Sequence, residues 1–167
     1  MQRGLKALLT ASPVVAAALA GCSAPADPQV TFYSHGESVE VAPARYCEPT
    51  GEGCSPPAPD PVGELRVPEG APLQISVPGD VSATPWQVVY IYRDDKGQEV
   101  GGRAPVFGPD ERHSYTLRLP PDAARLEHVE VQQYSAVLSA AAEGGVDFGI
   151  SGTWVLDTRG APAPPTA

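Results

Sequence analysis

One segment, residues 85–93, is apolar on both faces of an extended strand. Side chains of a strand alternate between its two faces, so Pro-Trp-Gln-Val-Val-Tyr-Ile-Tyr-Arg divides into two sets. One face carries Trp86, Val88, Tyr90 and Tyr92, and the other carries Val89 and Ile91. A strand with apolar residues on both faces is typical of the middle of a sheet. We therefore predict that the other strands pack around this one.

Several other segments alternate apolar and polar residues as half-buried strands do. They are residues 30–33, 37–42, 65–67, 73–77, 98–100, 113–119, 127–135 and 147–157, whereas residues 105–107 are a short segment between breakers. The chain has 20 prolines and 17 glycines, many at segment ends, which favours turns over helices. Residues 78–83 are predicted as a loop and residues 55–61 as an irregular connector. Residues 136–143 have a helix-forming composition, but Val137 and Leu138 fit a continued strand, so we predict a strand tip and a mobile loop.

This pattern of about eight to ten short strands, with no helical pattern after residue 21, predicts an all-β domain. The expected architecture is an antiparallel β-sandwich of the immunoglobulin-like type, with Trp86 and Trp154 in the core between the sheets. A small closed β-barrel is the alternative, because alternation alone does not distinguish the two architectures.

The first 21 residues have the regions of an export signal. Arg3 and Lys6 precede an apolar run over residues 7–20, and Leu-Ala-Gly leads into Cys22. This ending resembles the lipobox of bacterial lipoproteins, in which the cysteine receives a diacylglycerol thioether and becomes the new N-terminus. We predict a lipoprotein signal peptide over residues 1–21 and a lipid anchor on Cys22. An ordinary secretory signal with an incidental cysteine is the alternative.

The remaining chain divides into three parts. We predict a short polar tether over residues 22–28, a single β-sandwich domain over residues 29–158, and a disordered Pro/Ala tail over residues 159–167. No segment after the signal has the roughly 20 apolar residues of a spanning helix. The predicted location is the extracytoplasmic face of the cell membrane, held by the lipid on Cys22, because two acyl chains bind a bilayer stably.

The net charge of the chain limits the classes of partner that it is expected to bind. There are 20 acidic and 11 basic residues, for a formal net charge of −9. Removal of Arg3 and Lys6 with the signal leaves 9 basic residues against 20, a net charge of −11. This excess of acid argues against binding to nucleic acid and against electrostatic docking on anionic lipid. A solvated acidic surface explains it without any partner.

Two cysteines remain after Cys22. Cys47 and Cys54 are separated by the six residues Glu-Pro-Thr-Gly-Glu-Gly, and an exported protein meets an oxidising environment, so we predict that they form a disulfide. A metal site or a redox pair is the alternative, but the spacing is not Cys-x-x-Cys and no histidine lies nearby in sequence.

Six segments occur in an order that resembles a known family. They are Val-Thr-Phe-Tyr at residues 30–33, Tyr46-Cys47, Thr-Pro-Trp-Gln-Val at 84–88, Tyr-Thr-Leu at 115–117, Val-Glu-Val-Gln-Gln-Tyr at 129–134 and Gly-Thr-Trp-Val-Leu at 152–156. The chain is similar to envelope lipoproteins of high-GC Gram-positive bacteria, known as domain of unknown function 2771. The resemblance implies an envelope lipoprotein, nothing catalytic, and no site residues to carry over; residues 136–145 are the part that matches least.

The sequence lacks the usual catalytic signatures. There is no Gly-x-Ser-x-Gly elbow, His-Glu-x-x-His motif, phosphate-binding loop or dinucleotide fingerprint, so we predict no enzyme and no cofactor. His113 and His128 would approach one another if their strands pair, but lone surface histidines are commoner than metal sites, and His35 falls in a turn. The segment Asp-Asp-Lys-Gly at residues 94–97 is explained by a turn and lacks the alternating carboxylates of a calcium loop.

Tyrosines provide one further candidate. Tyr90, Tyr92 and Tyr115 have core-facing positions, whereas Tyr33 and Tyr134 fall on the solvent side of their strands. Exposed tyrosines can bind glycans or proteins, although covering the edge of the core also explains them. The leading expectation is a non-enzymatic envelope adaptor or accessory module that contacts another envelope protein. A receptor for an envelope glycan or small ligand is the alternative, and an enzyme of an unrecognised type is the third hypothesis.

Overall fold

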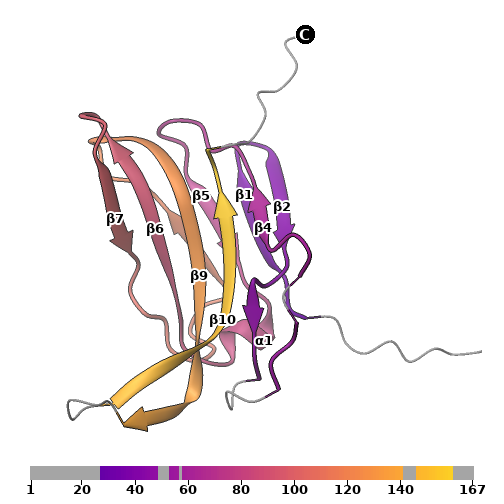
Figure 1. Cartoon of the computed structure of the whole chain (residues 1–167). Helices are drawn as coiled ribbons and strands as arrows, with labels where there is room; N and C mark the ends of the chain where they lie inside the picture. The colour runs from indigo at the N-terminus through magenta and orange to yellow at the C-terminus, as the bar shows by residue number, and fades with distance from the viewer. Residues whose placement is uncertain (1–26, 49–52, 57, 141–145, 160–167) are drawn as a thin grey trace, which may run out of the picture.

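The computed structural model describes residues 27–48, 53–56, 58–140 and 146–159. The chain forms two sheets that pack face to face, with one short helix at one end (Figure 1). The first sheet has the order β2 (Glu37–Val41), β1 (Val30–Ser34), β5 (Leu73–Ser76) and β8 (Ser114–Leu117). The second has the order β3 (Arg45–Tyr46), β10 (Val146–Asp157), β9 (Ala123–Ala140), β6 (Trp86–Asp94) and β7 (Glu99–Arg103), and β4 (Val62–Glu64) also pairs with β10.

The strand order is that of an immunoglobulin-like sandwich. The strands β10, β9, β6 and β7 correspond to the G, F, C and C′ strands of variable-type domains, and β1, β5 and β8 correspond to A, B and E. Neighbouring strands are antiparallel except β4 and β10, which are parallel. The predicted all-β sandwich is therefore confirmed, and the two separate sheets do not form the closed barrel that was the alternative.

The two tryptophans lie between the sheets as predicted, each with no exposed surface. The indole N–H of Trp86 donates to the carbonyl of Arg112 at 3.1 Å, and that of Trp154 donates to the carbonyl of Pro28 at 2.8 Å. Gly152 leaves space for the second ring, because a Cβ at this position would lie 2.6 Å from Cη2 of Trp154. Large apolar rings whose polar atoms are satisfied form the centre of the fold.

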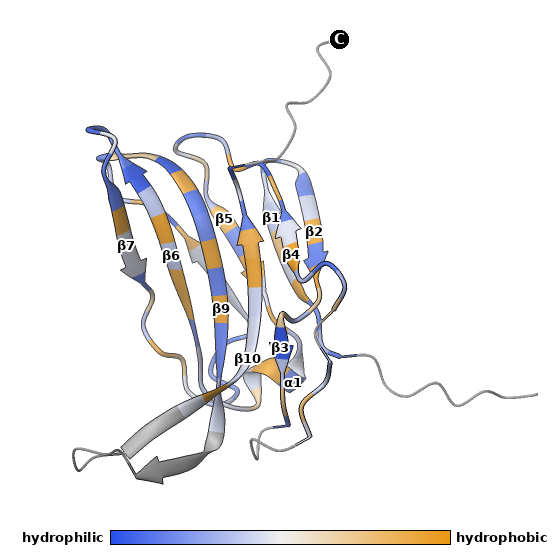
Figure 2. Ribbon diagram, in the orientation of Figure 1, coloured by the Kyte–Doolittle hydropathy of each residue, from blue (hydrophilic) through white to orange (hydrophobic). Residues whose placement is uncertain are grey.

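The organising strand, β6, lies inside the second sheet between β9 and β7, which confirms its predicted position. Hydrophobic and hydrophilic residues alternate along the neighbouring strand β9 (Figure 2). The inward face of β6 is buried, with Val88 fully buried and Tyr92 8% exposed. The outward face is less covered, because Val89 and Ile91 are only half-buried and no second layer packs on them among the described residues.

The prediction of a plain loop over residues 78–83 is wrong, because a one-turn helix α1 (Gly79–Ser82) forms there. The amides of Val81 and Ser82 both donate to the carbonyl of Pro78 at 3.1 Å. Val81 is fully buried, and the side-chain amide of Gln133 on β9 donates to the carbonyls of Asp80 and Val81 at 2.8 and 3.2 Å. Contacts distant in sequence therefore hold the turn that local propensity does not indicate.

The strand predicted over residues 65–67 is also misplaced. The strand of this region is β4, three residues earlier, and it pairs parallel to the end of β10. The turn after it is correctly placed: Gly70 has φ +71°, and the amide of Ala71 donates to the carbonyl of Pro68 at 3.0 Å. The strands on either side of this turn belong to different sheets, so the segment crosses from one sheet to the other and is not a hairpin.

Strand β9 is longer than predicted at both ends and continues to Ala140, paired with β10. The two strands project as a hairpin past the end of the sandwich (Figure 1), which agrees with a strand tip at the start of residues 136–143. Residues 141–145, the predicted signal with Cys22, and most of the predicted tether and tail lie outside the described residues. Within the described chain, no helix is long and apolar enough to cross a membrane.

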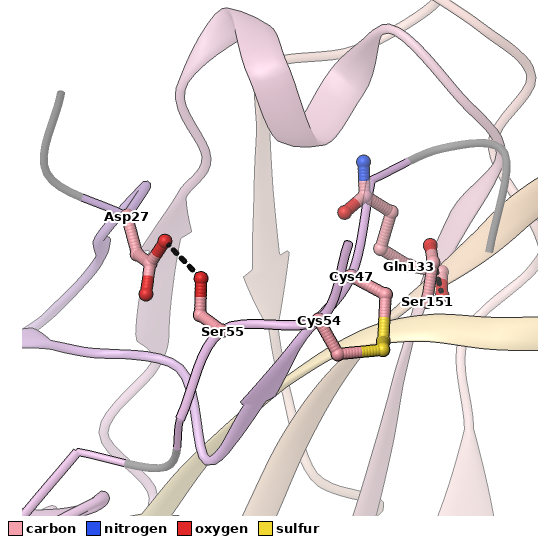
Figure 3. Close-up of a disulfide and its surroundings, with 6 residues drawn as sticks. All are labelled: Asp27, Cys47, Cys54, Ser55, Gln133 and Ser151. Carbon is pink, nitrogen blue, oxygen red and sulfur yellow. Dashed lines mark hydrogen bonds between the residues drawn. A yellow bond between two sulfur atoms is a disulfide. The ribbon is translucent and has the colours of Figure 1, made fainter. Parts of the chain in front are cut away.

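The predicted disulfide between Cys47 and Cys54 is present. It lies beside β3 (Figure 3). The amide of Cys47 donates to the carbonyl of Ser151 at 2.7 Å. Because Cys47 is only 1% exposed, the bridge attaches the loop to the edge of the core.

We expect Cys47→Ser to lower the free energy of unfolding by about 2.5 kcal/mol, the loop-closure entropy of so short a loop. Urea unfolding of the purified oxidised protein and of the variant measures the difference. Reducing the wild type with dithiothreitol should reproduce the loss, and the variant should not respond to dithiothreitol. Equal stabilities in all four conditions would contradict the stabilising role of the bridge.

Candidate functional site

The outward side of the second sheet contains an open hollow of about 570 Å³ over β9, β6 and the edge strand β7. Eight residues line it, among them Tyr90 and Gly102. We call the surface formed by the other six the β6 face: Val89 and Ile91 on β6, Gly101 and Arg103 on β7, and His128 and Glu130 on β9. The face exists because β6 is apolar on its second side, whereas the alternating strands beside it place polar residues outward.

The register of the strands orders the β6 face in two rows. In the first row, Val89 lies directly between Arg103 and Glu130, and in the second, Ile91 lies between Gly101 and His128. Each apolar side chain therefore has a β7 residue on one side and an ionisable β9 residue on the other. The rows continue on β10, where Val155 follows Glu130 and Asp157 follows His128.

A carboxylate and two arginines close one end of the β6 face. Glu127, whose side chain is 2% exposed, accepts hydrogen bonds from Nε and a terminal nitrogen of Arg93 at 2.8 and 3.0 Å, and from Nε of Arg125 at 2.9 Å. These bonds, that from Arg93 above all, hold the pKa of Glu127 below its usual range, although burial acts in the opposite direction. Arg93 also donates to the carbonyl of Gly97 at 2.7 Å, so the cluster fixes the turn between β6 and β7.

Amide side chains lie at the other end. Gln87 on β6 is 5% exposed, and its side-chain amide bonds the Tyr134 hydroxyl and, at 3.3 Å, the Gln132 side chain. Burial raises the pKa of Tyr134, which stays a neutral phenol at physiological pH. Gln132 donates in turn to Oε1 of Glu130 at 3.0 Å, and this orients one carboxylate of the β6 face.

The three histidines do not come together. His113 precedes β8 in the first sheet, with Nδ1 2.9 Å from the hydroxyl of Ser82, whereas His128 lies outward on β9 in the second sheet. Their strands do not pair, so the condition for a shared metal site fails. His35 occupies the β1–β2 turn with φ 50°, and the described residues contain no group of three metal-ligating side chains.

The other candidates from the sequence are separated as well. Tyr33, 42% exposed, is on the first sheet, and Tyr134 is on the second, so the two tyrosines do not form one patch. Asp94 accepts the amides of Lys96 and Gln98 at 3.0 and 2.7 Å, which is the bonding of a turn and explains this segment without calcium. The β6 face contains only one of the residues singled out for chemistry from the sequence, His128.

These features define a class of protein: an immunoglobulin-like sandwich that presents a partly apolar, charge-rimmed sheet face. The chain belongs to the family described as protein of unknown function (DUF2771), which it matches over residues 23–159. It is 30% identical over 153 residues to uncharacterized proteins of Mycobacterium bovis and of two strains of Mycobacterium tuberculosis, a match covering 86% of this chain and 91% of each relative. No solved structure matches the chain.

Proposed function

We propose that this protein is a lipid-anchored, non-enzymatic binding module of the cell envelope, an adaptor or accessory subunit for another envelope protein. The observation that carries the proposal is the β6 face, where Val89 and Ile91 are exposed in part and ringed by Arg103, His128 and Glu130. Apolar centres with polar rims are characteristic of protein interfaces. The absence of catalytic motifs from the sequence supports a binding role over catalysis.

The proposed anchor would hold this face close to the membrane. Asp27, near the end of the predicted tether, accepts a hydrogen bond from Ser55 at 2.8 Å beside the disulfide (Figure 3). Cys22 precedes Asp27 by five residues, which span at most about 18 Å. A lipid on Cys22 would therefore keep the disulfide end of the sandwich beside the bilayer and leave the β6 face free to contact a neighbouring envelope protein.

Photo-crosslinking in intact cells tests the proposal. The full chain carries a photo-crosslinking amino acid in place of Val89, and mass spectrometry identifies what is captured after irradiation. We expect one specific envelope protein, captured from the membrane fraction. A matched probe in place of Tyr33, which lies on the other sheet, should not capture it. Capture of nothing specific from position 89 would contradict the binding module.

The same cells test the anchor. Cys22→Ala should move the protein from the membrane fraction to the soluble fraction, because the export signal would no longer yield a lipidated N-terminus. Immunoblots of the two fractions measure the shift, and Cys47→Ser is the control because it removes a different cysteine and should stay on the membrane. Full membrane association of Cys22→Ala would contradict a lipid anchor on this residue.

A receptor for an envelope glycan or small ligand is the second candidate, favoured by the hollow of about 570 Å³ with polar groups on its rim. Its volume is within the range of ligand sites, but such sites usually enclose their ligand and this hollow lies open on a sheet. Titration of the purified protein with soluble envelope glycan fragments, followed by nuclear magnetic resonance, tests this function. Shifts confined to the β6 face would support a receptor, and unchanged spectra would exclude the fragments used.

A further inference from the structure

The geometry points to a second copy of this chain as the protein that binds the β6 face. This inference rests on the proposed binding role of the β6 face, and it names a second copy of this chain, in place of a different envelope protein, as the occupant of that face. We propose that two copies pack face to face about a two-fold axis that runs along β6, with Val89 against Val89 and Ile91 against Ile91. Two sheets packed with their strands nearly aligned are the ordinary arrangement of β-sandwiches.

The register makes the β6 face complementary to itself. An axis along β6 keeps the height of each residue and exchanges the two sides, so a residue on β7 of one copy faces the residue on β9 of the other in the same row. In the row of Val89, Arg103 faces Glu130 of the second copy, twice by symmetry. Arg103 is exposed and makes no ion pair within the described residues, so its charge is available.

The neighbouring rows are complementary in shape and in charge. In the row of Ile91, His128 faces Gly101 of the second copy, and the space above Gly101 is empty because no atom lies within 4 Å of the position of a Cβ. In the row of Arg93, Glu99 faces Arg125 of the second copy, and each of these side chains is 60% exposed. The side chain of His128 thus meets a glycine, and Glu99 and Arg125 each meet an opposite charge, whereas the two copies of Arg93 face each other on the axis, each already paired with Glu127 of its own chain.

The charge of this surface differs from that of the whole chain. The chain has a net charge of −9, which opposes self-association. On the β6 face and in the ion pairs beside it, four arginines accompany four carboxylates, namely Arg93, Arg103, Arg125 and Arg159 with Glu99, Glu127, Glu130 and Asp157. Two copies can therefore meet here without the repulsion that the rest of the surface imposes.

The two-fold symmetry is also compatible with two chains that are anchored in the same membrane. A two-fold axis parallel to β6 leaves the disulfide end, where Asp27 lies, at the same end of both copies. Both proposed anchors then reach one membrane. Strands β10, β9, β6 and β7 together are only about 15 Å wide, so the interface is small. We therefore expect association to depend on the high local concentration that a shared membrane supplies.

The test uses the full chain, expressed with two different affinity tags in the same cell and solubilised in mild detergent. One tag is used for capture and the other for detection. Arg103→Glu in both chains, or Glu130→Arg in both chains, should lower co-purification more than tenfold, because like charges then face each other. Arg103→Glu in one chain with Glu130→Arg in the other should restore co-purification to near the wild-type level, since one ion pair is re-formed with reversed sign and the other is unchanged.

The controls separate this inference from the proposed function. Arg118→Glu in both chains makes the same charge change on an exposed residue after β8, and it should leave co-purification unchanged. Failure of wild-type chains to co-purify, or co-purification that ignores Arg103→Glu, would overturn the dimer. If the probe at position 89 still captured a different envelope protein, the binding module would stand; if it captured nothing, both would fall.

Discussion

Trp154→Ala is expected to lower the free energy of unfolding by about 4 kcal/mol, a large part of the total stability of a small domain. The ring is fully buried between the sheets and lies 6.1 Å, centroid to centroid, from Tyr46 of β3. Its removal leaves a cavity and deprives the carbonyl of Pro28 of its donor. The first described residues would then lose one of their attachments to the core.

Urea unfolding followed by circular dichroism measures this effect, and two variants divide it into parts. Trp154→Phe keeps most of the apolar contact and loses the hydrogen bond to Pro28, so it should cost about 1–2 kcal/mol. Tyr33→Ala removes an aromatic ring that is 42% exposed on the first sheet and should change stability by less than about 0.5 kcal/mol. A loss in Trp154→Ala as small as that in Tyr33→Ala would contradict the placement of Trp154 in the core.

The elements that the sequence predicted correctly are those whose signal is local. Strand β6 was placed in the middle of a sheet because both of its faces are apolar, and the two tryptophans were placed in the core because alternation sets their side. Turns rich in Gly, Asp and Pro marked the ends of the strands, as Asp94 shows by accepting two amides of its own turn. The sandwich class follows from many such short segments.

The elements that were missed depend on contacts distant in sequence. The helix α1 is held by Gln133, which is 53 residues away from Asp80, and β4 is defined by pairing with β10, which is more than 90 residues away. Neither partner can be identified from a local pattern, because hydrophobic periodicity reports which face is buried and not which strand is adjacent. The prediction for residues 65–67 was based on the apolar residues Leu65 and Val67. It therefore missed β4, which ends just before them.

The candidate site was missed for the same reason. The sequence identified Val89 and Ile91 as the second apolar face of their strand. It did not indicate that this face forms an open hollow. Arg103 and Glu130 come to Val89 through pairing on both sides of β6, and strand order was not predictable from the sequence. Once the order is known, the site follows from the period of two in each strand.

Glu127→Gln is the second large expected effect, a loss of about 3 kcal/mol in the free energy of unfolding at pH 7. The buried carboxylate accepts charge-assisted hydrogen bonds from Arg93 and Arg125, and a glutamine would turn a donor toward these arginines. Thermal unfolding of wild type and variant at pH 7 measures the loss. Equal stability at that pH would show that the cluster contributes nothing.

The loss should vanish at low pH, and this dependence identifies the ionised carboxylate as its cause. The folded pKa of Glu127 lies below its ordinary value of 4.5, so its charge stabilises the folded state fully above pH 4.5. That contribution is lost as the pH falls through the lower folded pKa. The difference between wild type and Glu127→Gln should therefore be constant from pH 8 to about pH 5 and shrink below that pH. A difference unchanged at low pH would indicate packing as the cause.

The two arginines contribute unequally, and their variants complete the argument. Arg93 bonds both carboxylate oxygens and is 34% exposed, whereas Arg125 bonds only Oε1 and is 60% exposed. Arg93→Met leaves a buried carboxylate with one oxygen unpaired and releases the turn at Gly97, so it should destabilise the protein more than Arg125→Met does. Because water screens the more exposed pair, 1 M salt should remove the effect of Arg125→Met and retain most of that of Arg93→Met. The cluster then acts as a rigid end to the β6 face, and its loss weakens the surface on which we propose that binding depends.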